Sequence, residues 1–220
     1  MFDADGHTYE TVQIGTQCWT KTNLRSAKDR NGNAFINGNA AFFGGFDATN
    51  DSVVYIPTQE TWNVNNSLVT YNNSIFGYFY NWKAANLVCP AGWHLPTDAE
   101  WTTLTDYVKM ESAYACGVDA DYIAKALADT TTAWKSFEDD PCAPGYAPSS
   151  NNTTGFGAVP AGYYYNSSLH DFGNYANFWS STEYNGPYVY TCSLYYDYAY
   201  VDNYSNDKNL GFSVRCLRDE

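Results

Sequence analysis

Cys89-Pro90-Ala91-Gly92-Trp93-His94-Leu95-Pro96-Thr97-Asp98-Ala99-Glu100-Trp101 is the most informative string of this chain. The segment 97–100 follows a proline and has the Thr-x-x-Glu pattern of a capping box, so a helix is predicted to begin there. Trp101, Leu104 and Val108 then lie at helical spacing and predict one buried helix face. Residues 80–87 also show helical spacing, and the Cys89-Pro90 pair is expected to end that first helix.

The rest of the chain reads as strands and loops around these two helices. Residues 7–15 alternate in polarity and stop at Gly15, which predicts an N-terminal hairpin. Residues 178–181, 188–200 and 212–217 are rich in residue types that favour strands, and 119–129 predicts a third, weaker helix. We therefore expect an α+β fold class, with two main helices packed on antiparallel sheets with long loops. No repeat or linker stands out, so a single domain over 1–220 is expected.

Composition argues against several kinds of partner. The net charge is −13, and nucleic acid requires many lysines and arginines, so no nucleic acid is expected. No apolar run is long enough to span a bilayer, so we expect no direct membrane insertion. No Cys-x-x-Cys pair is present, and Asp3-Ala4-Asp5-Gly6 has no glutamate at the calcium-loop offset. No metal and no cofactor are therefore expected.

The six cysteines stand at 18, 89, 116, 142, 192 and 216. An even number at wide spacing favours disulfides in an oxidising, extracellular compartment. The residues alone leave the connectivity open.

Several strings, in order along nearly the whole chain, resemble one family, the Fibrobacter succinogenes major paralogous domain. They are Ile14-Gly15-Thr16-Gln17-Cys18-Trp19, Gly77-Tyr78-Phe79-Tyr80-Asn81-Trp82, the string 89–101, Phe178-Trp179-Ser180-Ser181 and Gly211-Phe212-Ser213-Val214-Arg215-Cys216. The resemblance implies a C-type-lectin-like fold and a place on the surface of gut Bacteroidetes or on the virions of their phages. The chain departs from the family pattern by insertions near 111–122 and 138–153.

The resemblance also bears on the cysteines and on catalysis. It implies a Cys89–Cys216 disulfide, and Cys116–Cys142 is the favoured second pair because both cysteines lie in the insertions. Cys192 is expected to be unpaired or bonded to Cys18. Formylglycine-generating enzymes, which share the implied fold, use a reactive cysteine pair, but here the first pair looks structural.

No catalytic residue is expected, and the chain is interpreted as not an enzyme. Glu100 is explained by helix capping. His94 stands beside a helix start with no nucleophile nearby, so we expect a hydrogen-bonded core histidine.

Residues 184–207 contain eight tyrosines and resemble the variable segment of proteins from diversity-generating retroelements. Those elements randomise adenines in template Asn codons, which cannot produce Glu, Lys, Gln, Met or Trp, and none of these occurs in the segment. Tyrosines at both strand parities predict that some face solvent and bind a partner, against the alternative that they fill an ordinary sheet. The expected ligand-binding residues, gathered on one surface with the asparagines at its rim, are Tyr184, Asn185, Tyr188, Tyr190, Asp197, Tyr198, Tyr200, Asp202, Tyr204 and Asn206.

Two functions remain open from the sequence. The first is a ligand-binding variable protein of a diversity-generating retroelement, recognising an unknown protein or glycan as part of a larger surface or virion assembly. The alternative is a fixed structural or adhesive cell-surface module of a bacterial attachment or polymer-degrading system.

Overall fold

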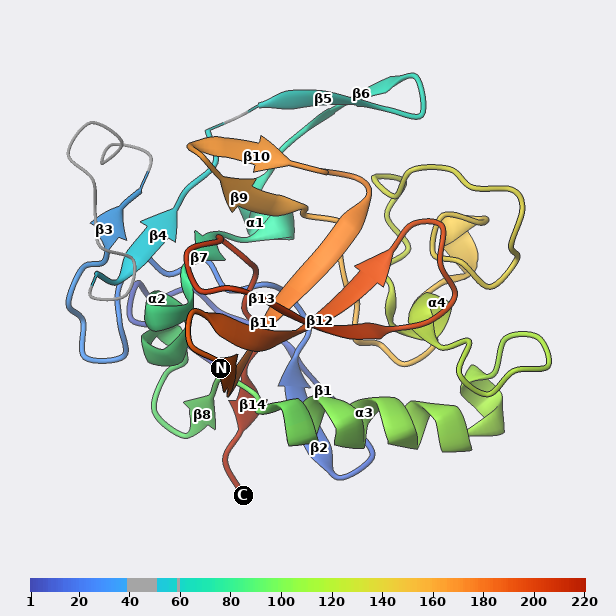
Figure 1. The fold of residues 1–220 in the computed structure, drawn as a ribbon, viewed down its shortest axis with the longest axis horizontal. Helices are drawn as coiled ribbons and strands as arrows, with labels where there is room; N and C mark the ends of the chain where they lie inside the picture. The colour runs from blue at the N-terminus through green and yellow to red at the C-terminus, as the bar shows by residue number, and fades with distance from the viewer. Residues whose placement is uncertain (39–50, 59) are drawn as a thin grey trace.

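The computed structural model describes residues 1–38, 51–58 and 60–220 (Figure 1). The two ends of the chain meet in one antiparallel sheet, in the order β1 (Thr11–Ile14), β2 (Gln17–Thr20), β14 (Leu217–Arg218) and β8 (Trp93–His94). β1 and β2 form the predicted N-terminal hairpin, and Gly15 in its turn has a φ of 58°, which glycine adopts without strain. Leu217 pairs with Trp19 on one side and with His94 on the other, so this sheet joins the start, the middle and the end of the chain.

The helices are short apart from one. They are α1 (Asn73–Phe76), α2 (Trp82–Val88), α3 (Asp98–Met110) and α4 (Ala124–Leu127), with 3-10 turns at Ser112–Tyr114 and Pro148–Ser150. α3 begins with the predicted capping box, in which the Thr97 hydroxyl accepts from the Glu100 amide and the Glu100 carboxylate accepts from the Thr97 amide. The helix expected over 119–129 is reduced to the single turn of α4. None of the helices in the described part of the chain has both the length and the apolar character needed to cross a membrane.

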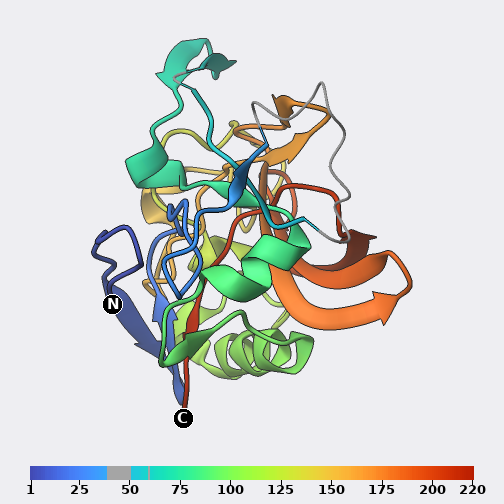
Figure 2. The same ribbon diagram turned by 90° about the vertical axis from the view of Figure 1, so that its left-hand side faces the viewer.

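The remaining strands are distributed over four further sheets. β3 (Ile36–Asn37) runs parallel to β4 (Val53–Tyr55), which pairs antiparallel with β7 (Phe79–Tyr80). β5 (Thr61–Val64) with β6 (Ser67–Thr70), and β9 (Tyr163–Tyr165) with β10 (Ser168–His170), are two-stranded hairpins. The longest strands, β11 (Tyr175–Asn185) and β12 (Tyr188–Tyr195), form an antiparallel sheet with β13 (Asp202–Asp207). The turn of the β11–β12 hairpin extends away from the rest of the molecule (Figure 2).

The predicted α+β fold of the C-type-lectin-like class is wrong for this structure. Strands account for 33% of the chain and helices for 16%, and the strands lie in several small sheets. The two expected main helices are present as α2 and α3, but no layer of helices covers one continuous sheet. The physical reason is that most strands span only two to four residues, and β3, β7, β8 and β14 have two each. Such strands cannot extend into one large sheet.

A buried arginine connects the largest cluster of core side chains to the start of the chain. Arg215 is fully buried, with its guanidinium carbon 4.6 Å from the centre of the Phe156 ring. It donates to the side-chain oxygen of Asn23 at 2.8 Å. It also donates to the carbonyls of Thr20, Phe156 and Gly157, at 2.9, 2.7 and 2.6 Å. Every one of these partners is an uncharged oxygen, so Arg215 acts as a hydrogen-bonding hub and holds the residue 156–157 turn against β2.

Candidate functional site

The sheet β11–β12–β13 positions most of the predicted binding residues, and its register sorts them onto two faces. Tyr190 pairs with Ser205, and the next residue, Thr191, pairs with Tyr204. Successive side chains of a strand point to opposite faces, and paired residues share a face. Tyr190 and Tyr204 therefore lie on opposite faces of the sheet.

The first face carries a group that we call the hairpin-end group, at the turn between β11 and β12. The rings of Tyr184 and Tyr190 meet edge to face, with centroids 5.3 Å apart. Farther along the same face, Phe178, Cys192 and Leu194 are buried against α3 and hold the backbone of the hairpin. The exposed end is thus an extension of a packed sheet. The members of the group are Tyr184, Asn185, Tyr188 and Tyr190.

The second face is hollowed beside β9, and we call this concavity the tyrosine hollow. It has a volume of about 440 Å³. Its floor includes Asn177 and Ser193, which hydrogen-bond to each other at 2.8 Å, and its sides are aromatic. The tyrosine hollow is lined by Tyr163, Tyr165, Tyr175, Asn177, Ser193, Tyr195, Tyr204, Ser205, Asn206, Leu210 and Phe212.

The loop between β12 and β13 forms a third group, which continues from the tyrosine hollow toward the 111–122 insertion. Tyr198 contacts both Tyr195, at 6.5 Å between centroids, and Tyr200, at 4.9 Å. Tyr200 packs edge to face on Tyr122 at 5.0 Å and donates a hydrogen bond to Asp119 at 3.1 Å. The contacts of Tyr200 with Tyr122 and Asp119 raise its pKa and anchor it to the insertion.

Burial and nearby carboxylates raise the pKa of two tyrosines of the hollow, Tyr195 and Tyr204. Burial, with a further effect of Asp202, raises the pKa of Tyr195 to about 12. The charge of Asp202 also raises the pKa of Tyr204. Burial in turn raises the pKa of Asp202 itself. Tyrosine is neutral at pH 7 without any shift, so these side chains present uncharged rings and hydroxyl donors.

The structure does not gather the ten predicted residues on one surface. Four belong to the hairpin-end group on one face, Tyr204 and Asn206 line the tyrosine hollow on the other, and Asp202 shares the face of Tyr204. The remaining three, Asp197, Tyr198 and Tyr200, lie in the connecting loop. The sequence did not predict several residues of the tyrosine hollow, because they precede the segment 184–207. Their one visible signal is the run Tyr163-Tyr164-Tyr165.

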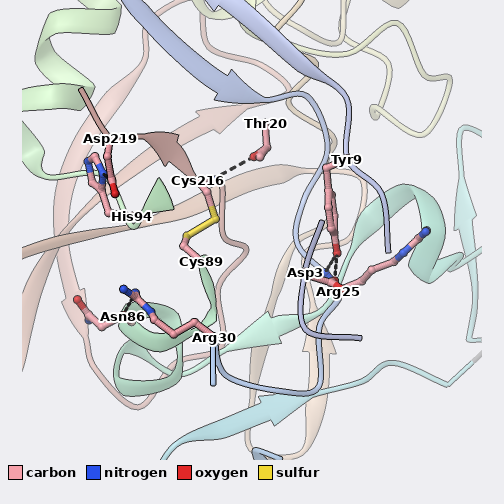
Figure 3. Close-up of a disulfide and its surroundings, with 10 residues drawn as sticks. All are labelled: Asp3, Tyr9, Thr20, Arg25, Arg30, Asn86, Cys89, His94, Cys216 and Asp219. Atoms are coloured by element: carbon pink, nitrogen blue, oxygen red, sulfur yellow. Dashed lines mark hydrogen bonds and ion pairs between the residues drawn. A yellow bond between two sulfur atoms is a disulfide. The ribbon is translucent and has the colours of Figure 1, made fainter. Parts of the chain in front are cut away.

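Both predicted disulfides are present. Cys89 and Cys216 are bonded across 127 residues, and Figure 3 shows this bridge between the end of α2 and the last strand. The Cys216 amide also donates to the Thr20 hydroxyl at 3.0 Å.

The second disulfide, between Cys116 and Cys142, joins the two insertions. Cys18 and Cys192 are free thiols, and the two bridges indicate an oxidising, extracellular environment.

His94 is hydrogen-bonded as predicted, but it is partly exposed and lies outside the core. Its ring nitrogens lie 2.9 Å from the Glu100 carboxylate and 2.7 Å from the Asp219 carboxylate. Figure 3 shows His94 beside Asp219 near the end of the chain. Ionised carboxylates only accept hydrogen bonds, so both contacts are hydrogen bonds at once when the imidazole is protonated, and they favour that form. The cluster fastens the end of the chain to the start of α3.

No cluster of three or more metal-ligating side chains occurs in the residues that the structure describes. The segment 3–6, which resembles the start of a calcium loop, has a structural role instead. Asp3 accepts from the amides of Asp5 and His7 and from the Tyr9 hydroxyl, and Asp5 pairs with Lys28. These carboxylates close a local turn.

Comparison with known proteins was informative at the family level. The family model described as the Fibrobacter succinogenes major domain matches residues 12–218. Neither a curated protein nor a solved structure matches this chain significantly. The family match spans nearly the whole sequence, and the tyrosine clusters of the surface are compatible with a role in recognition. The chain belongs to the Fibrobacter succinogenes major domain family.

Proposed function

We propose that this chain is a ligand-binding protein whose tyrosine-rich surface recognises an external protein or glycan, and that a diversity-generating retroelement varies this surface. The observation that carries the proposal is the separation between surface and scaffold. None of the ten predicted residues is buried. Five side chains within and beside the same sheet are buried and form part of its scaffold: Phe178, Trp179, Leu194, Phe212 and Val214.

The chemistry of the surface supports binding. Tyrosine rings provide large, rigid contact areas that lose little conformational entropy on binding, and asparagine and aspartate add adaptable hydrogen bonds. Tyr184, Tyr188, Tyr198 and Tyr204 are all exposed. Exposed aromatic clusters of this kind usually mark interaction sites. We propose that the chain binds and does not catalyse, and that it acts at a bacterial surface or on a phage virion as part of a larger assembly.

The buried positions within 184–207 make the retroelement proposal testable. Val189, Leu194 and Ala199 are buried, and codons for Val, Leu and Ala have no adenine in their first two positions. A template with the same bases there would leave them unchanged. Thr191 is also buried, yet its codon begins with adenine, so it would be open to variation.

Sequencing the DNA around the coding region tests the proposal directly. We expect a near-identical repeat of the segment encoding 184–207, differing only where the repeat has adenine, with those adenines concentrated at codons of exposed residues. The absence of a repeat, or differences spread over the codons of Val189 and Leu194, would contradict diversification. A fixed cell-surface module would then be the better description.

A further inference from the structure

The tyrosine hollow combines aromatic faces with an acidic border. Its lining contains five tyrosines and neither lysine nor arginine among the residues that the structure describes. Asp202 pairs across the sheet with the lining residue Ser193, and Asp171 follows His170, which pairs with the lining residue Tyr163. Asp197 lies near Tyr175 and acts on it electrostatically, as Asp171 does. The negative potential of these carboxylates adds to that of the ring faces.

These three carboxylates lack a basic partner. No ion pair within 1–38, 51–58 and 60–220 includes Asp171, Asp197 or Asp202. Lys208 follows β13 closely, but its ammonium lies 3.0 Å from the Glu183 carboxylate and 4.6 Å from the centre of the Trp82 ring. It is therefore engaged elsewhere and leaves the charge of the tyrosine hollow uncompensated.

The chain itself shows how such a surface accommodates a cation. Lys208 lies over an aromatic ring and beside a carboxylate at once. Lys135 lies over Tyr196 at 4.5 Å from the ring centre. A cation over a tyrosine face is attracted by the negative potential of the ring, and more strongly where water is excluded. The tyrosine hollow offers the same kinds of ring and carboxylate, and no lysine or arginine of the described residues lines it.

We propose that the tyrosine hollow binds a lysine or arginine side chain presented by a partner protein. This proposal rests on the proposed recognition function and specifies the partner's chemistry. A volume of about 440 Å³ is sufficient for one long side chain. An anionic group would be repelled by the three carboxylates. A neutral sugar could stack on the rings, but it would leave the carboxylate charges uncompensated.

Nuclear magnetic resonance of the isotope-labelled full chain tests this with four probes. They are N-acetyl-lysine methylamide, its arginine and norleucine counterparts, and maltotriose as a neutral saccharide. We expect the two cationic probes to shift the amide signals around Asn177, Tyr195 and Tyr204, weakly and in proportion to occupancy. The norleucine probe has the same apolar stem without the charge, so it should produce much smaller shifts.

Matched variants then locate the binding. Tyr204 and Tyr184 are 54% and 53% exposed but lie on opposite faces, so Tyr204→Leu and Tyr184→Leu form a controlled pair. Tyr204→Leu should weaken binding of the lysine probe about two- to fivefold, and Tyr184→Leu should leave it unchanged. Asp202→Asn should weaken it similarly, and added salt should do the same. Unchanged signals elsewhere in each variant confirm that the fold is retained.

Three results would overturn the inference. Equal shifts from the norleucine probe would show an apolar hollow, and shifts from maltotriose alone would show a glycan site. The absence of any localised shift would show that the hollow is not a cation site. The recognition function itself would survive all three outcomes, because it depends on the diversification test and on the whole tyrosine surface.

Discussion

Tyr184 and Tyr204 lie on opposite faces of one three-stranded sheet, although they are almost equally exposed, at 53% and 54%. Tyr184 packs on Tyr190, whereas Tyr204 is paired in the sheet with Thr191, the next residue along the strand. The tyrosine-rich segment therefore offers two separate surfaces. One is the projecting hairpin-end group and the other is the concave tyrosine hollow.

Removal of exposed tyrosines should leave the fold intact. The triple variant Tyr184→Ala, Tyr188→Ala and Tyr190→Ala is expected to change the free energy of unfolding by about 1 kcal/mol, because these rings lie at the projecting end of the hairpin and none belongs to the buried core. Phe178→Ala in the same sheet is fully buried and should cost about 3–5 kcal/mol. Chemical denaturation of both variants measures the contrast. A triple variant that unfolds would mean that the hairpin end is part of the core.

The two disulfides should differ in their contribution to stability. Cys89–Cys216 closes 127 residues and Cys116–Cys142 closes 26, and a longer loop loses more entropy when it is cross-linked in the unfolded chain. Replacing the first pair by alanines is expected to cost about 1 kcal/mol more than replacing the second. Thermal or denaturant unfolding compares the double variants. Non-reducing peptide mapping of the parent chain checks the pairing and would contradict it if Cys89 were found with another cysteine.

The two free thiols should differ in reactivity. Burial raises the pKa of the Cys192 thiol far above its usual range, which suppresses the reactive thiolate. Cys18 is partly exposed. Alkylation of the native protein at pH 8 is expected to label Cys18 and to spare Cys192 until denaturant is added. Mass spectrometry of the digested protein reads out both sites, and rapid native labelling of Cys192 would refute its burial.

Arg215 should tolerate no substitution, even by another cation. Arg215→Lys keeps the charge but cannot satisfy four oxygens with one ammonium, so we expect a loss of about 3 kcal/mol. Arg218→Lys, at an exposed position of β14, is the matched control and should have little effect. Equal stability of the two variants would show that the hydrogen-bonding hub contributes little.

His94 should make stability depend on pH near neutrality. Burial lowers the pKa of His94, but hydrogen bonds with Asp219 and Glu100 outweigh this effect and raise it above the usual value. A raised pKa means that the folded state binds the proton more tightly. The stabilisation is therefore complete below about pH 6.5 and is lost as pH rises through the folded-state pKa. Because the cluster is partly exposed, the loss should be at most about 1 kcal/mol.

Melting curves between pH 5.5 and 8.5 measure this effect. The parent chain should lose more stability over that range than His94→Gln, which cannot titrate. Parallel curves for the two proteins would show that the cluster does not couple the end of the chain to α3.

The positions of several local elements could be predicted from the sequence. The capping box predicted the start of α3, because its hydrogen bonds form between residues only three apart in the sequence. Gly15 predicted the hairpin turn, because few residues other than glycine adopt a positive φ. The solvent exposure of the tyrosine segment also followed from its pattern, since tyrosines at both parities cannot all face one core. The family resemblance supplied the Cys89–Cys216 pair, and the position of Cys116 and Cys142 in the two insertions favoured the second pair.

The sequence by itself determined local features: the capping box, the turns and a tyrosine surplus that must partly face solvent. Only the tertiary structure decided how many sheets the strands form and which tyrosines meet. Pairing partners such as Leu217 with Trp19, and the approach of Tyr163 to Tyr204 across the hollow, join residues far apart in the chain. Such contacts depend on the simultaneous packing of the whole core, and periodicity along the chain records only the orientation of each side chain relative to its neighbours.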